Sequence, residues 1–174
     1  MSDLMSGTVP VGGPFTLTDH DGNTRRLSDF RGKVVLLYFG FTYCPDVCPT
    51  DLLVISEVMQ RLGADALRVQ PIFITLDPER DTPGMLRSYV TSFHPSFVAL
   101  TGTQARVRAV ATAYKVFFEK VQPAGTPTYF IDHMSFTFLI DAQGRYVGAL
   151  PRGTPPERMA PVVRDALTAS RPAE

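Results

Sequence analysis

The stretch KVVLLYFGFTYCPDVCPT, residues 33–50, decides how this chain is interpreted. Its first half, Lys33–Gly40, is apolar at nearly every position, which is typical of a central strand buried on both faces of a sheet. Cys44 and Cys48 follow directly, and Pro49 predicts the first turn of a helix, because proline is tolerated there but not in later turns. The stretch therefore predicts a buried strand, a two-cysteine turn and a helix in direct succession.

Strands and helices alternate over much of the remaining chain. Pro14–Leu17 and the turn signal Asp19–Asn23 predict an N-terminal β-hairpin. The alternation implies crossovers and parallel strand pairing, to which the later strands add hairpins. The sequence thus predicts an α/β fold with a mixed central sheet flanked by helices, an N-terminal β-hairpin and an extra hairpin insertion. The elements expected after the cysteines are the helices Pro49–Leu62, Pro83–Phe93, Thr103–Tyr114 and Pro155–Ala169 and the strands Val69–Leu76, Phe97–Leu100, Val116–Val121, Tyr129–Asp141 and Arg145–Leu150.

Length and composition fit a single domain. The 174 residues are 44% hydrophobic, which is enough for a substantial core. Lys+Arg and Asp+Glu both number 17, so the chain lacks the basic excess of a nucleic-acid-binding protein. No apolar run approaches the roughly 20 residues that a membrane-spanning helix needs. We expect a flexible N-terminal segment over residues 1–12, one domain over residues 13–170 and a flexible tail over residues 171–174.

The two cysteines are the strongest chemical signal in the chain. Two are too few for a disulfide scaffold or a four-cysteine zinc site. Four residues of helix rise about 6 Å and nearly complete a turn, so both sulfurs would share one face, within range of a disulfide or of one metal ion. A helix N-terminus also stabilises the thiolate that both reactions need. Buried structural thiols or an inert disulfide are disfavoured, because Pro45, Asp46 and Thr50 flank the pair instead of an apolar run.

One of the three histidines is a further ligand candidate. We expect His20 to be solvated in the hairpin turn and His94, before Pro95, to serve local structure. His133 lies in an apolar strand, where a histidine alone is more often a core residue than a ligand. The presence of two cysteines makes a ligand role for His133 more plausible, because two thiolates and an imidazole together form a soft donor set that suits copper or zinc. Structural zinc takes four protein ligands and no fourth is evident, so copper, or zinc with an open position, is favoured.

The chain resembles the Sco/SenC family of copper-binding assembly proteins over nearly its whole length, from about Gly12 to the last helix. The motifs that carry the resemblance are GKVVLLYFGFT over residues 32–42, YCPDVCPT over residues 43–50, DPERDTP over residues 77–83 and the dipeptide Asp132–His133. Two cysteines at this spacing are a weak signal alone, whereas all of these motifs in this order are specific. A strand that runs into a two-cysteine turn and then a helix also resembles the thioredoxin-like arrangement.

The resemblance implies a thioredoxin-like fold and one copper ion per chain, as Cu(I) or Cu(II), bound by Cys44, Cys48 and His133. It implies a role in building the dinuclear copper site of cytochrome c oxidase subunit II, with another copper chaperone as a candidate donor. Family members are usually tethered by an N-terminal membrane helix, at the periplasmic face of the bacterial inner membrane or in the mitochondrial intermembrane space. By this resemblance residues 1–12 would be the remnant left after such an anchor is removed.

The two residues that follow His133, Met134 and Ser135, differ from those usual in related proteins. Met134 stands where a small polar residue is more usual in the family, and Ser135 stands where thioredoxin-like reductases carry a proline, which favours metal binding over general disulfide exchange. Asp77 ends the second predicted strand on the sheet edge that carries the cysteines. It is a candidate hydrogen-bond acceptor beside the metal ligands or a charge for partner docking. Turn and helix-cap chemistry over residues 77–83 explains Asp77 equally well.

Two function hypotheses from different classes follow. In the first, a metallochaperone binds copper through Cys44, Cys48 and His133 and passes it on by ligand exchange with a partner's cysteines. In the second, a thiol–disulfide oxidoreductase uses Cys44 and Cys48, without His133, to reduce the copper-site cysteines of subunit II or of another partner. The two hypotheses are compatible, because oxidation of the cysteine pair to a disulfide would release the metal. Whether the chain is an enzyme therefore stays open. A thiol peroxidase is disfavoured because the chain has no other cysteine.

Overall fold

The computed structural model of the chain describes residues 11–43 and 47–170 and contains a mixed seven-stranded sheet. Its strands are β1 Thr16–Asp19, β2 Thr24–Arg26, β3 Val34–Gly40, β4 Val69–Thr75, β5 Val98–Thr101, β8 Phe136–Ile140 and β9 Tyr146–Pro151. They lie in the order β2-β1-β5-β4-β3-β8-β9. The pairs β3–β4 and β4–β5 are parallel, whereas β3–β8 and β8–β9 are antiparallel.

The two strands at the centre of the sheet are the two that the apolar runs predicted. Every residue of β3 and of β4 is buried. Strands covered by helices on both faces need apolar side chains on both faces, which is why these runs do not alternate. The strand that leads into the cysteine segment is therefore fixed at the centre of the core.

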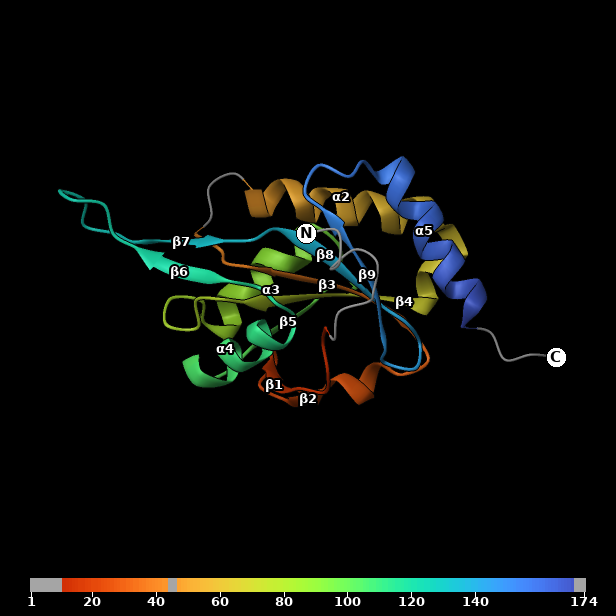
Figure 1. The fold of residues 1–174 in the computed structure, drawn as a ribbon, viewed down its shortest axis with the longest axis horizontal. Helices are drawn as coiled ribbons and strands as arrows, with labels where there is room; N and C mark the ends of the chain where they lie inside the picture. The colour runs from red at the N-terminus through yellow and green to blue at the C-terminus, as the bar shows by residue number, and fades with distance from the viewer. Residues whose placement is uncertain (1–10, 44–46, 171–174) are drawn as a thin grey trace.

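Helices cover both faces of the sheet. In Figure 1, α2 and α5 lie side by side above the sheet and α4 lies below it. α3 covers the same face as α2, since Phe73 on β4 packs on Tyr89 of α3 and on Tyr38, whose hydroxyl bonds to Asp51 of α2. α2 ends where Gly63 takes a φ of +58°, a left-handed conformation that glycine adopts without strain. Thr82 caps α3, since its hydroxyl accepts the N–H of Met85 at 3.3 Å and Pro83 follows. The helical elements are η1 Leu27–Phe30, α2 Val47–Leu62, η2 Gly63–Arg68, α3 Pro83–Thr91, α4 Gln104–Ala113 and α5 Pro156–Ala169.

A second, two-stranded sheet projects from the domain. Its strands, β6 Phe118–Val121 and β7 Phe130–His133, are antiparallel, and Figure 1 shows them extending away from the main sheet. The single strand predicted over Tyr129–Asp141 is wrong in this respect, because the pairing changes at residues 134–135. β7 pairs with β6 and is mostly accessible, whereas β8 pairs with β3 and is buried throughout. His133 therefore ends the hairpin at its junction with the core.

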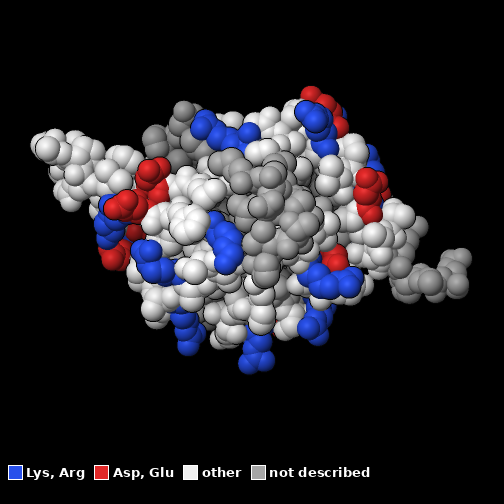
Figure 2. Space-filling view, viewed as in Figure 1, with Lys and Arg blue, Asp and Glu red and all other residues white. Residues whose placement is uncertain are grey.

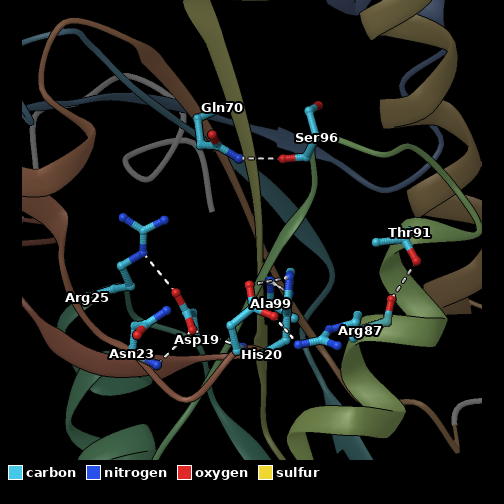
Figure 3. Close-up of polar contacts among 10 residues, drawn as sticks. Asp19, His20, Asn23, Arg25, Gln70, Arg87, Thr91, Ser96 and Ala99 are labelled. Carbon is cyan, nitrogen blue, oxygen red and sulfur yellow. Dashed lines mark hydrogen bonds and ion pairs between the residues drawn. The ribbon is translucent and has the colours of Figure 1, made fainter.

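The N-terminal hairpin is docked by polar contacts that Figure 3 shows. Asp19 accepts the N–H of Asn23 and the Nε–H of Arg25, each at 2.9 Å. His20 was expected to be solvated, and this is wrong: its side chain is 13% exposed, and its Nδ1 accepts the N–H of Ala99 at 3.2 Å. The turn thus packs on β5 instead of standing in solvent.

The architecture confirms the predicted fold class, with a mixed sheet between helices, an N-terminal hairpin β1–β2 and an inserted hairpin β6–β7. Of the helices that the described residues form, none is long and apolar enough to cross a membrane. On the face drawn in Figure 2, the described acidic and basic side chains form small separate groups without a continuous patch of one sign.

Candidate metal centre

The three predicted ligands are described to different extents. Cys44 lies outside the described residues, and Cys48 is described as the second residue of α2 without its side chain. His133, the last residue of β7, is described in full. Across residues 11–43 and 47–170, no group of three or more histidine, cysteine, aspartate or glutamate side chains could hold a metal ion. The geometry of the site therefore follows from His133 and from the residues that flank the cysteines.

Strand pairing carries His133 to the segment that leads into the cysteines. Tyr38 on β3 stands opposite Thr137 on β8. His133 lies three residues before Phe136, where β8 begins, and Phe41 directly follows Gly40, where β3 ends, so the pairing brings these two segments near one another. The packing agrees: the ring of Phe41 meets the imidazole of His133 edge-on, with centroids 5.7 Å apart and planes at 78°. The imidazole lies beside the chain just before the first cysteine.

The hydrogen bond of His133 fixes which ring nitrogen carries the lone pair. Its Nδ1 lies 3.0 Å from the carbonyl oxygen of Met134. Because a carbonyl can only accept, Nδ1 must carry the hydrogen, and the lone pair of the neutral ring is then on Nε2. Histidines that bind metals commonly donate their other ring N–H to a backbone carbonyl in this way. The arrangement fits a neutral imidazole that binds a metal through Nε2.

An open hollow of about 350 Å³ borders the histidine. Phe117 is 72% exposed at its edge, and Glu119 stands opposite Asp132 across the hairpin. The hollow gives another molecule a direct approach to the imidazole. Its lining residues are Phe117, Phe118, Glu119, Asp132, His133 and Met134.

A buried carboxylate anchors the chain that enters the cysteine segment. Asp81 accepts the N–H of Thr42 at 3.1 Å and its hydroxyl at 2.5 Å, and it accepts the hydroxyl of Thr75 at 2.6 Å. Burial raises the pKa of Asp81, although these hydrogen bonds act in the opposite direction. The sequence offered only turn and cap chemistry at this position, because nothing local reveals a partner 39 residues away. Thr42 is thereby held two residues before Cys44.

Asp77 is an internal acceptor that connects three parts of the chain. Its side chain is 2% exposed, accepts the Nε–H of Arg80 at 2.5 Å and accepts the hydroxyl of Tyr129 at 2.7 Å. Its own N–H donates to Thr75 at 3.0 Å. Burial and the bond to Asp77 raise the pKa of Tyr129 to about 12, so this hydroxyl keeps its proton as a donor. Asp77 thus ties the end of β4 to the loop end of β7, the strand that carries His133.

A family comparison covers almost the whole chain. The SCO1/SenC family model matches residues 4–168. This chain belongs to the SCO1/SenC family. A SCO2-like protein of Rickettsia felis is 41% identical over 146 residues, which make up 83% of this chain and 71% of the relative. The curated relatives of this SCO1/SenC chain include mitochondrial SCO2 proteins as well as bacterial ones. The family expected from the sequence motifs is confirmed.

Solved structures of Sco proteins share the fold of this SCO1/SenC chain. Copper-bound ScoI of Bradyrhizobium japonicum is 42% identical and superposes with a TM-score of 0.82, covering 90% of this chain and 99% of that one. BsSco, described with a disulfide switch as a member of the Sco family of cytochrome c oxidase assembly proteins, is 24% identical with a TM-score of 0.70, covering 91% and 92% of the two chains. At this level of identity, the similarity to BsSco shows that the two proteins share a fold. The predicted thioredoxin-like fold is confirmed.

The start of α2 in this SCO1/SenC chain rests on a buried polar pair. The hydroxyl of Tyr38 on β3 donates to Asp51 on α2 at 2.9 Å, and both side chains are buried. An aspartate near the start of a helix is ordinarily exposed, whereas Asp51 is 8% exposed. A hydrophobic strand gives little sign that one tyrosine meets a carboxylate 13 residues away. The contact fixes the helix start, where Cys48 lies, to the central strand.

Proposed function

We propose that this SCO1/SenC protein binds one copper ion through Cys44, Cys48 and His133 and delivers it to the dinuclear copper site of cytochrome c oxidase subunit II. The observation that carries the proposal is the contact between the rings of Phe41 and His133, which brings the imidazole beside the chain entering the cysteine segment. Copper in the related ScoI structure supports the choice of metal. The family's part in cytochrome c oxidase assembly supports the destination.

The covalent chain limits how far the cysteines can lie from His133. Cys44 follows Thr42 by two residues, and two residues of extended chain span about 7 Å at most. Cys48 is the second residue of α2, in the turn of a helix that best stabilises a thiolate. Two thiolates and a neutral imidazole are donors that copper accepts. These features support a three-ligand copper site at the junction of β3, α2 and β7.

Copper is the cargo in this proposal, so release matters as much as binding. Delivery would proceed by ligand exchange: a thiolate of the acceptor forms a bond to copper as a bond to one of the three ligands breaks. No electron needs to move in such a step. The imidazole is the one neutral ligand, and His133 borders the open hollow at the hairpin. Exchange at His133 would therefore begin the transfer, with the two thiolates displaced afterwards.

The alternative is a thiol–disulfide oxidoreductase that reduces the copper-site cysteines of subunit II or of another partner. The start of a helix in a thioredoxin-like fold favours it, because thiolates there attack disulfides. One thiolate of the pair would attack a partner disulfide, and the second would then resolve the mixed disulfide. The partner gains two electrons and two protons, and Cys44 and Cys48 end as a disulfide. His133 has no part in this reaction.

Copper titration of the reduced protein tests the two functions against each other. We expect one copper per chain for the wild type, about tenfold or greater loss of affinity for His133→Ala, and loss of the site when both cysteines become serine. His94→Ala is the matched control, since that ring accepts hydrogen bonds from Ser96 on another loop. Unchanged stoichiometry and affinity in His133→Ala would remove the histidine from the site. Fast reduction of a model disulfide, unaffected by that substitution, would favour the oxidoreductase.

The location and donor of copper follow from the same proposal. The protein would act at the periplasmic face of a bacterial inner membrane, or in the mitochondrial intermembrane space if the source is eukaryotic, held there by an N-terminal anchor. A second copper chaperone would load it through the same exchange of thiolate ligands. Fractionation of cells that express the full-length gene product would test the location, and a product confined to the cytoplasm would contradict it.

A further inference from the structure

One guanidinium stands between the two segments that carry the proposed ligands. The Cζ of Arg80, in the loop after β4, lies 4.5 Å from the ring centroid of Tyr43 and 3.6 Å from that of Tyr129. Tyr43 directly precedes Cys44, and Tyr129 directly precedes β7, which ends at His133. Arg80 therefore contacts the flank of each ligand-bearing segment through residues outside the proposed ligand set.

Arg80 is itself held in place from two directions. Its Nε donates to Asp77 at 2.5 Å, and its Nη1 donates to the carbonyl oxygen of Tyr129 at 2.8 Å. The hydroxyl of Tyr129 closes the ring of contacts by donating to the other oxygen of Asp77 at 2.7 Å. We call these four residues, Tyr43, Asp77, Arg80 and Tyr129, the Arg80 clamp. The clamp joins the end of β4, the chain before the cysteines and the loop end of β7.

The contacts of the clamp need an arginine. A guanidinium is planar and can stack between two rings while it donates hydrogen bonds within its own plane, which a lysine ammonium cannot do. The Nη2 of Arg80 is buried and has no hydrogen-bond partner within the described part of the chain. A buried donor without a partner is unfavourable, so stacking between the tyrosines, more than complete hydrogen bonding, sets this position. That is expected of a residue whose task is to hold two segments together.

We propose that Arg80 is a positioning residue for the copper site. It holds the hairpin against the chain that enters the cysteine segment and thereby sets the distance from the imidazole of His133 to the paired sulfurs. This inference rests on the proposed copper function. It goes beyond that function in one respect: Arg80 would contribute to the copper affinity without touching the metal, by holding His133 in position.

The first test needs no copper and compares amide hydrogen exchange in Arg80→Met, Arg80→Lys and the wild type. We expect exchange over residues 118–121 and 130–133 to accelerate about tenfold in both variants, since neither replacement can stack and donate as arginine does. Arg25→Met is the matched control: Arg25 also binds a buried aspartate, Asp19, through Nε at 2.9 Å, and lies over the ring of Phe30 at 5.3 Å (Figure 3 shows the Arg25–Asp19 bond). Equal effects of Arg80→Met and Arg25→Met on the hairpin would overturn the proposal.

The second test is a double-mutant cycle on copper affinity. Arg80→Met should weaken copper binding about tenfold in the wild-type background and leave it unchanged within about twofold when His133 is already alanine, because the effect passes through the imidazole. Tyr43→Leu removes one ring from an exposed position and should act in the same direction if Arg80→Met fails to fold. Additive losses with His133→Ala would overturn the role. A wild type that binds no copper would end the proposed function, while hydrogen exchange would still decide whether Arg80 holds the hairpin.

Discussion

Replacing Asp81 with alanine should destabilise the fold and release the chain that enters the cysteine segment. The carboxylate accepts three hydrogen bonds, one from Thr75 and two from Thr42. Thr75 is fully buried, so its stranded hydroxyl costs about 1–3 kcal/mol, and each bond to the half-buried Thr42 contributes about 0.5–1.5 kcal/mol. Burial raises the pKa of Asp81, so the substitution also relieves some desolvation. The expected net loss is about 2–4 kcal/mol in the free energy of unfolding.

Thermal unfolding measures this loss. In a chain of this size about 1 kcal/mol shifts Tm by about 2–4 °C, so Asp81→Ala should unfold about 5–15 °C below the wild type. Asp29→Ala is the control, since Asp29 is exposed and accepts the N–H of Arg26 at 2.8 Å. That variant should lose about 0.5–1.5 kcal/mol. Equal losses in the two variants, or an unchanged Tm in Asp81→Ala, would refute the role of Asp81 as a buried anchor.

Three further predictions concern the same polar contacts. Folding raises the pKa of Asp81 above 3.8, because burial disfavours its charged form. The wild type should therefore exceed Asp81→Asn in free energy of unfolding by its full margin below pH 3.8, and this margin should be lost as the pH rises through the raised pKa. Urea unfolding at a series of pH values measures the margin. Tyr129→Phe should remove an ultraviolet titration step near pH 12, and the stability from the bond to Asp77 should be present below pH 10 and disappear as the pH rises through about 12. Tyr38→Phe should lower the free energy of unfolding by about 1–3 kcal/mol, since it removes a buried bond to Asp51; a change below about 0.5 kcal/mol in urea unfolding would contradict this.

The backbone of the fold could be predicted wherever a local pattern has one physical meaning. The apolar runs around Leu36 and Ile72 predicted two central strands because only burial on both faces explains a run without alternation. Thr82 and Pro83 predicted the start of α3, and Gly63 the end of α2, since both signals depend on backbone conformation alone. These features are local, so no knowledge of distant partners was needed.

The polar contacts that shape the candidate site could not be predicted in the same way. Neither Asp51 nor Asp81 carries a local signal of burial, yet each is buried and bonded to a residue far along the chain. The break between β7 and β8 was missed because residues 129–141 have no turn signal such as glycine or proline, and the change of pairing partner depends on β6. His133 was selected for its chemistry beside two cysteines, and its place next to Phe41 is a consequence of strand register that composition does not contain.

The most direct measurement is copper-edge X-ray absorption on the reconstituted protein, because it counts the atoms bound to the metal. The proposed site predicts two sulfur ligands and one imidazole nitrogen in the wild type, with the imidazole signal absent from His133→Ala and the sulfurs retained. A spectrum with the same nitrogen signal in both proteins would contradict the claim that folding brings His133 to the cysteine pair.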